Sequence, residues 1–384
     1  MVPPGKEALS TSDFAHARAL HERWFTLDTH LDTPTARFMR PGWDFAARHA
    51  FADDGSQCDL PRMAEGGLAG AVFAVYVGQA ARTPEGLATA HVRAVACLER
   101  THEVLRANAT QVGLALTADD GPALQQAGRR AIYLSLENAY SLGRDPANVA
   151  KFHALGVRMI GLNHMLNNDV ADSSTDPRGA EWGGLSPFGR EVVAECNRLG
   201  ITLDASHASD DALADLLELS RAPVVLSHSG PRAVCDHPRN VGDELLRELA
   251  AKGGVLQINA LPISLVDDPG NRRTEAVAEL LLRFQDLPPT PETRAAEDKA
   301  FDDVCARYPN PAVSLSDVVR HIEHAAEVMG PDHVGIGFDL DGGGGTFEGL
   351  REVADYPNVT AALLEKLWGL NSLRLMRAVE AAAG

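Results

Sequence analysis

The chain has 384 residues, of which 45% are hydrophobic and 23% are charged, so its length and composition suit a globular protein with a large core. Its 53 acidic residues outnumber its 35 basic residues and give a formal net charge of −18, which disfavours nucleic acids and anionic lipids as partners. No apolar run reaches the ~18–20 residues that a membrane-spanning helix needs.

Short runs of β-branched and apolar residues recur along the chain, and longer amphipathic stretches separate them. We predict that eight such runs are strands, several of which follow a Gly that would end the preceding element. These runs lie at residues 26–32, 68–78, 130–139, 157–165, 201–207, 223–229, 254–260 and 333–341.

The stretches between the runs place apolar residues at helical spacing, and several begin with a Ser or Asp that can cap a helix. The predicted helices lie at residues 87–107, 186–200, 209–220, 242–253 and 314–330. Strands that alternate with helices indicate a parallel sheet, and eight of them suit a (β/α)8 TIM barrel of the α/β class better than an open sheet. No GxGxxG motif follows the first run, which argues against a dinucleotide-binding fold.

One long segment interrupts the regular spacing between the seventh and eighth predicted strands. Residues 262–313 are charged and contain several prolines, and we expect them to be an insertion with its own helices near the mouth of the barrel. Residues 42–60 form a smaller excursion after the first strand. We therefore expect a single barrel domain over residues 1–384 that carries one large insertion.

Histidines and carboxylates gather where the predicted strands end. Six of the eight runs end in or just before such residues, namely His30 and Asp32, Glu137, His164, His207, His228, and Asp339 with Asp341. The carboxyl ends of barrel strands converge on one mouth, where active sites are built, so we expect these side chains to meet.

Imidazole and carboxylate groups are the usual ligands of zinc and related divalent ions, and a carboxylate can bridge two ions ~3.5–4 Å apart. Residues i and i+2 of a strand point to the same face, so His30 and Asp32 can aim at one metal. Each of these residues could instead be a hydrogen-bonded residue at a strand end with no role in metal binding. That interpretation has to be made separately for each position, whereas one metal site explains them together. For His164 the spacing alone leaves three roles open: a further ligand, an oxyanion donor or a structural residue.

The five cysteines are few, odd in number and scattered, and they form no CxxC pair. We interpret them as reduced thiols of a cytoplasmic protein. The first 20 residues lack the unbroken apolar core of a signal peptide, which agrees with that expectation.

Six segments together resemble the membrane dipeptidase (renal dipeptidase) family of binuclear zinc peptidases, within the amidohydrolase superfamily. They occur in the family's order, and the resemblance runs from about residue 24 to the C-terminus. The segments are DTHLDTP at 28–34, Glu137, LNHMLNNDVADSS at 162–174, DASHAS at 204–209, SHSGPRAVCDHPRN at 227–240 and DHVGIGFDLDGG at 332–343.

The resemblance implies a centre of two Zn²⁺ ions, although other divalent metals share such ligands. His30 and Asp32 would bind the first zinc, and His207 and His228 would bind the second. Glu137 would bridge the two ions.

The resemblance also implies roles for residues that touch the substrate. His164 would contact the oxygen of the scissile bond, and Arg239 would hold the α-carboxylate of the substrate. Asp339 would shuttle protons, and we prefer it to Asp341, which we interpret as a turn residue before four glycines.

The activity that the resemblance implies is hydrolysis of L-L dipeptides and of L-D dipeptides by a hydroxide that bridges the metals. The same centre could instead serve an N-acyl amino-acid deacylase, a lactonase or a β-lactam hydrolase. A different class, a metal-dependent binding or scaffold protein without turnover, also stays open at this point. By analogy with the family, the chain is expected to form a homodimer.

Two departures from the family pattern bear on the substrate. Asn138 follows Glu137 where family members often have Gly, and we expect it to alter the pocket wall beside the metals. The seventh predicted strand ends in Asn259-Ala260-Leu261-Pro262, where the renal enzymes have an aromatic residue near the substrate.

Overall fold

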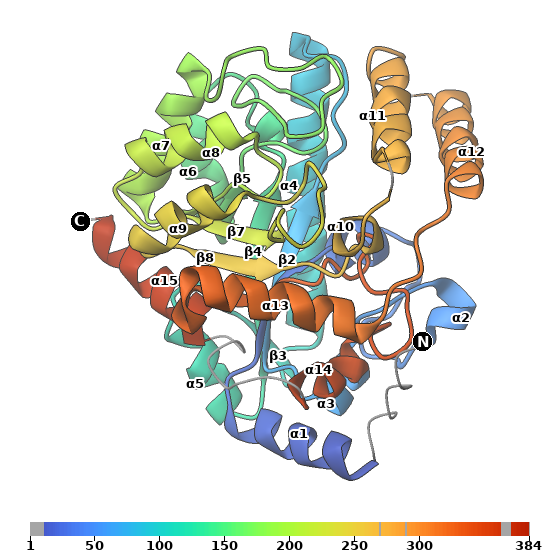
Figure 1. Ribbon diagram of the computed structural model, residues 1–384, viewed down its shortest axis with the longest axis vertical. Helices are drawn as coiled ribbons and strands as arrows, with labels where there is room; N and C mark the ends of the chain where they lie inside the picture. Colours follow the sequence, from blue (N-terminus) through green and yellow to red (C-terminus); the bar gives the residue numbers. More distant parts are fainter. Residues whose placement is uncertain (1–10, 269, 289, 362–369, 384) are drawn as a thin grey trace.

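Eight parallel strands surround a common axis in the computed structural model, which describes residues 11–268, 270–288, 290–361 and 370–383 (Figure 1). The strands pair in the order β1-β2-β4-β5-β6-β7-β8-β9. They are β1 Leu27–Leu31, β2 Gly70–Tyr76, β4 Arg130–Glu137, β5 Val157–Gly161, β6 Thr202–Asp204, β7 Val225–Ser229, β8 Val255–Ile258 and β9 Val334–Ile336. All eight predicted strands are thus confirmed.

The first strand and the segment after the last one close the ring. Leu31 and Leu340 form a parallel bridge, and the Asp32 amide donates a hydrogen bond to the Leu340 carbonyl at 3.0 Å. The Asp339 amide donates to the His30 carbonyl at 3.1 Å. The α/β barrel that the sequence predicts is therefore confirmed, and its closure brings the two ends of the predicted site together.

The five predicted helices are also confirmed as α4 Pro84–Ala107, α7 Pro187–Leu199, α8 Asp210–Leu219, α9 Asp243–Ala251 and α13 Leu315–Met329. Side chains cap three of them, since Thr83, Ser186 and Ser209 each accept a hydrogen bond from a backbone amide three residues later. Further helices that the periodicity did not single out are α1 Thr11–Arg23, α2 Phe51–Asp54, α3 Leu60–Gly66, α5 Asp120–Gln126, α6 Ala147–Ala154, α14 Tyr356–Thr360 and α15 Leu370–Ala382.

Alternation along β4 shows how the sheet separates the core from the barrel interior. Ile132 and Leu134 belong to the large apolar cluster that packs against the helices. Tyr133 belongs to a second cluster, which α15 helps to form. Because side chains alternate faces, Ser135 and Glu137 follow Tyr133 on the inner face. The inward direction of Glu137 is therefore set by the strand itself.

Residues 262–313 contain three helices, α10 Pro262–Leu265, α11 Arg272–Gln285 and α12 Pro291–Arg307. Figure 1 shows α11 and α12 side by side as a helical hairpin at the edge of the barrel. The segment thus has its own helices, as the sequence predicts.

Two details differ from the sequence predictions. A short extra strand, β3 Val112–Leu114, pairs with the start of β4. Several strands also end earlier than predicted, so His164, His207 and Asp339 lie in the loops that follow β5, β6 and β9. Asp339 has a positive φ of 60°, which a strand residue does not adopt.

Within the described ranges, no helix combines the length and the apolar character needed to cross a membrane. All five cysteines are free thiols in the described part of the chain.

Candidate active site

A cavity of about 640 Å³ opens at the carboxyl ends of the strands. Its volume falls in the range of pockets that hold small molecules. Seven of the predicted site residues line it: Asp32, Glu137, His164, His207, His228, Arg239 and Asp339. The insertion contributes to the same wall, as expected from its place in the sequence, through residues of α10, α11 and α12.

The carboxylate of Glu137 lies at the centre of the site and presents its two oxygens to different imidazoles. Oε2 lies 3.5 Å from Nε2 of His30. Oε1 lies 3.2 Å from Nε2 of His207, 3.6 Å from Nε2 of His228 and 3.9 Å from Nε2 of His164. One carboxylate thus lies between two separate sets of nitrogen donors.

On the β1 side, His30 lies in a group with two carboxyl groups. Nε2 of His30 lies 3.4 Å from Oδ2 of Asp32. His30, Asp32 and Asp339 form a cluster whose potential ligand atoms all lie within 4.8 Å of one another, and so do His30, Glu137 and His228. Glu137, His164 and His207 form a third cluster of this kind. The geometry required for cation binding is therefore present on both sides of Glu137.

A buried hydrogen-bond network lies behind His228 and fixes the direction of its ring. The Ser227 hydroxyl lies 2.8 Å from Nδ1 of His228 and donates to Oδ2 of Asp204 at 2.6 Å. Oδ1 of Asp204 accepts from the Ser206 hydroxyl, and the Ser206 hydroxyl accepts from the His228 amide at 3.0 Å. Because Ser227 donates to Asp204, it accepts from Nδ1–H of His228, which leaves Nε2 with a free lone pair toward Glu137.

Asp204 and Ser227 are functional residues that the sequence analysis did not single out. Asp204 lies in the DASHAS segment and Ser227 in the SHSG segment, both of which carry the family resemblance. The available signal was a carboxylate and a hydroxyl within two consecutive predicted strands.

Burial and charge shift the titration of the central groups in opposite directions. Burial lowers the pKa of His30, but the charges of Glu137 and Asp32 more than offset this and raise it well above its ordinary value. Burial raises the pKa of Glu137, but the surrounding imidazoles lower it well below the ordinary range. Burial lowers the pKa of His207 and of His228, so these rings are neutral and able to bind a cation.

His164 lies at the open side of this cluster. Its ring lies 4.1 Å, centroid to centroid, from that of His207 and 4.5 Å from that of Tyr76. Its side chain is 24% exposed, against 8% for His207. Burial lowers the pKa of His164 to about 4, so the neutral ring offers one N–H to a group in the cavity.

Arg239 places a cation deep in the wall of the cavity. Nη2 donates to the His228 carbonyl at 3.1 Å, whereas Nη1 is buried with no hydrogen-bond partner among the described residues. Burial lowers the pKa of the guanidinium to about 10, which still leaves it charged at neutral pH. A buried donor of this kind suits the carboxylate of a ligand.

The structure separates Asp339 from Asp341. Burial and the charge of Asp32 raise the pKa of Asp339 well above its ordinary value. Asp341 instead accepts hydrogen bonds from Nε of Arg37 at 2.9 Å, from the Thr33 hydroxyl at 2.8 Å and from the Gln57 amide. Asp341 therefore anchors the loop, and Asp339 lies beside His30 and Asp32.

Asn138 does not have the expected effect on the pocket wall. It is absent from the described lining of the cavity, and its side chain bonds instead to the Tyr140 amide, the Asn168 amide group and the Val77 carbonyl. Its φ of 69° is left-handed, which Gly adopts freely and Asn tolerates better than most residues. Asn138 thus stabilises the local backbone and does not contribute to the described wall of the cavity.

These residues fit a centre of divalent cations. Nε2 of His30 is buried with no hydrogen-bond partner in the described part of the chain. Nε2 of His207 and Nε2 of His228 lie 3.0 Å apart and both face Glu137. Three carboxyl groups and three imidazoles that converge in this way form the nitrogen and oxygen donor set of zinc and its relatives.

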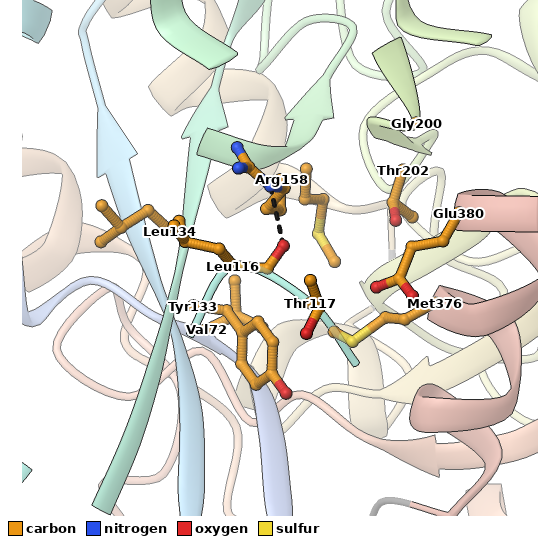
Figure 2. Close-up of a pocket in the computed structure, with 11 residues that line it drawn as sticks. Val72, Leu116, Thr117, Tyr133, Leu134, Arg158, Gly200, Thr202, Met376 and Glu380 are labelled. Atoms are coloured by element: carbon orange, nitrogen blue, oxygen red, sulfur yellow. Dashed lines mark hydrogen bonds between the residues drawn. The ribbon is translucent and has the colours of Figure 1, made fainter. Parts of the chain in front are cut away.

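A second, much smaller cavity lies near the opposite ends of the strands. Figure 2 shows it between Tyr133, Thr202 and Met376, with Arg158 donating a hydrogen bond to the Leu116 carbonyl at 2.9 Å. Its volume of about 20 Å³ is close to that of a single water molecule, so it cannot hold a peptide.

Comparison with known proteins adds to this geometry. A family model described as membrane dipeptidase (peptidase family M19) matches residues 14–384. The chain belongs to this family. As a member of the membrane dipeptidase family, the protein is a metallopeptidase that hydrolyses dipeptides.

Two relatives illustrate the extent of the match with the membrane dipeptidase family. Dipeptidase tcpJ of Claviceps purpurea is 32% identical over 366 residues, which cover 89% of this chain and 74% of that protein. The crystal structure of the probable dipeptidase PvdM from Pseudomonas aeruginosa superposes with a TM-score of 0.82 at 30% identity and covers 98% of this chain and 100% of that one.

A metallopeptidase from Rhodobacter sphaeroides, whose crystal structure holds a phosphinate mimic of the dipeptide L-Ala-D-Ala, superposes with a TM-score of 0.73 at 25% identity. This match covers 93% of this chain and 99% of that one.

Proposed function

We propose that the protein binds two divalent cations, Zn²⁺ in the first instance, and hydrolyses L-L and L-D dipeptides that carry a free α-carboxylate. The observation that carries this proposal is the position of Glu137. Its Oε2 faces His30 at 3.5 Å, and its Oε1 faces His207 at 3.2 Å and His228 at 3.6 Å. A carboxylate that serves two donor sets in this way suits two-metal hydrolysis.

In this proposal His30 and Asp32 would hold one cation, His207 and His228 would hold the other, and Glu137 would contact both. When bound, the two cations would lower the pKa of a water, so that hydroxide is available near neutral pH, and would polarise the scissile carbonyl.

Two groups that line the cavity beside this centre would position the substrate. The unpaired Nη1 of Arg239 would bind the α-carboxylate, and Nη2 keeps its bond to the His228 carbonyl, so that the guanidinium stays fixed. The neutral ring of His164 would donate its N–H to the oxygen of the scissile bond, where negative charge develops.

Asp339 would transfer the proton. Its carboxyl group lies in the cluster of His30 and Asp32, within reach of a water held there. It would accept the proton of that water and deliver it to the leaving amine. Acceptance of a D residue at the C-terminal position is supported by the L-Ala-D-Ala mimic bound to the Rhodobacter sphaeroides relative.

The test combines metal removal with a substrate panel. Exhaustive chelation should abolish hydrolysis of L-Ala-L-Ala and L-Ala-D-Ala, and added Zn²⁺ should restore it. A metal-free preparation that retains full activity would refute the proposal. N-acyl amino acids, lactones and β-lactams belong in the same panel. If the enzyme hydrolyses any of these faster than the dipeptides, that compound class is the preferred substrate instead.

We further propose that the chain forms a homodimer, as expected from the family resemblance. Light scattering coupled to size-exclusion chromatography should give about twice the chain mass of 41.0 kDa. A mass equal to that of one chain would overturn this expectation.

A further inference from the structure

The insertion presents apolar side chains to the cavity that the chemistry described above does not use. Ile263 of α10, Val277 of α11 and Phe301 of α12 all line it. Phe301 is 43% exposed, which is high for an aromatic side chain. An exposed apolar surface inside a ligand cavity is typical of a wall that a substrate covers.

The helical hairpin brings two of these side chains opposite each other. Arg273 of α11 donates a hydrogen bond to Sγ of Cys305 at 3.1 Å and another to the Tyr308 carbonyl at 2.8 Å, both at the end of α12. The two helices pack against each other. Val277 lies one turn after Arg273 on α11, and Phe301 lies one turn before Cys305 on α12. Both positions are one turn closer to the connecting loop than the Arg273–Cys305 contact, and both side chains line the cavity.

This apolar wall lies on the side of the cavity that holds Arg239. The Arg239 amide donates to Nδ1 of His237 at 3.1 Å, and Nε2 of His237 lies 2.7 Å from the Thr274 hydroxyl of α11. Thr274 and Val277 are three residues apart and share one helix face. The chain of contacts therefore runs from the proposed carboxylate-binding residue directly to the apolar face of α11.

We propose that Ile263, Val277 and Phe301 form the subsite for the side chain of the C-terminal residue of the dipeptide, and that this subsite selects apolar side chains. The inference rests on the proposed function, because it places the α-carboxylate on Arg239. A Leu or Met side chain at this position covers the wall, whereas an Asp side chain loses part of its hydration there. The cation in this wall, Arg273, already donates to the Tyr308 carbonyl and to Sγ of Cys305.

The test measures kcat/KM for L-Ala-Gly, L-Ala-L-Leu, L-Ala-L-Asp and L-Leu-Gly on the metal-loaded enzyme. Burial of a Leu side chain favours L-Ala-L-Leu over L-Ala-Gly by about 10-fold or more. Phe301→Ala and Val277→Ala should each reduce this ratio by about 5-fold. Because Phe301 is 43% exposed, its replacement should disturb folding less than that of a core residue.

Two further variants complete the test: a control outside the cavity, and a variant that should change the side-chain preference from apolar to basic. Leu287 in the connection between α11 and α12 is 45% exposed but is not part of the described cavity lining, so Leu287→Ala should leave the ratio unchanged. Phe301→Asp should raise kcat/KM for L-Ala-L-Lys relative to L-Ala-L-Leu, since it places a carboxylate in the wall.

Two results would overturn the subsite. One is an unchanged ratio in both alanine variants. The other is a loss that falls on L-Leu-Gly instead of L-Ala-L-Leu, which would assign the wall to the N-terminal residue. Failure of the proposed function is distinguishable, because the wild type would then hydrolyse none of the four dipeptides.

Discussion

Replacing Ser227 by Ala should weaken cation binding although Ser227 is not itself a proposed ligand. Its hydroxyl is the only link that the described residues show between Asp204 and Nδ1 of His228, with distances of 2.6 Å and 2.8 Å. Without it the His228 ring can rotate, and the tautomer that leaves Nε2 free is no longer favoured. The Ser227 hydroxyl also lies 3.5 Å from Nδ1 of His30. Cation binding by His30 and Asp32 should therefore weaken as well, but less.

The magnitude follows from the contacts that the hydroxyl makes. Loss of a hydrogen bond that orients a metal-binding His typically weakens metal affinity ~10–100-fold, or roughly 1.4–2.7 kcal/mol. The fold also loses a bond to a buried carboxylate, which costs about 1.5–3 kcal/mol. This second cost is reduced because Asp204 still accepts bonds from the Ser206 hydroxyl and the Ser227 amide.

The assay is competition for Zn²⁺ between the protein and a chromogenic chelator, with thermal unfolding of the metal-free protein measured alongside. Ser135→Ala is the matched control. Its hydroxyl is buried on β4 and has no hydrogen-bond partner within the described ranges, so the same atom is removed without loss of a hydrogen bond. Equal Zn²⁺ affinity in the two variants would refute the orienting role of Ser227.

Three further predictions address other parts of the molecule. Arg239→Lys should lower kcat/KM for dipeptides ~100-fold, mainly through KM, because the paired bonds of the guanidinium to a carboxylate are lost; an equal loss on a carboxyl-amidated peptide would contradict the assigned role. Asp339→Asn should lower kcat by ~10²–10⁴-fold while the metal content measured by mass spectrometry is retained, and loss of both would make Asp339 a ligand. Burial lowers the pKa of His21 to about 4, so the neutral ring stabilises the fold above its ordinary pKa of 6.5, and this stability is lost as the pH falls toward 4. From pH 7 to pH 5 the free energy of unfolding should therefore drop by about 2 kcal/mol more in the wild type than in His21→Gln, as measured by urea denaturation, and equal drops would show that His21 does not titrate in this way.

Much of the fold could be predicted because the strands are short, largely buried runs of apolar and β-branched residues, and a parallel barrel buries its strands on both faces. The grouping of the site followed from the same topology. His30, Glu137 and His228 are far apart in the sequence, but the carboxyl ends of their strands converge in the barrel.

The remaining features depend on tertiary contacts that no local pattern records. β3 has three residues with Gly113 at its centre, so it lacks the length and composition of a typical strand. The network of Asp204 and Ser227 depends on the alignment of β6 beside β7, where Asp204 pairs with Val225. The side of α11 that faces the cavity depends on the contact between His237 and Thr274.

The direction of the Asn138 side chain could not be predicted from the sequence either. Asn138 has a left-handed backbone φ, and its side chain contacts Tyr140 and Asn168. A residue next to a proposed ligand can thus serve the backbone alone.

The most direct test of the account is anomalous diffraction at the zinc absorption edge from crystals of the metal-loaded protein. The account predicts two peaks about 3.5–4 Å apart, one on each side of the Glu137 carboxylate. A single peak, or peaks that Glu137 does not contact, would contradict it.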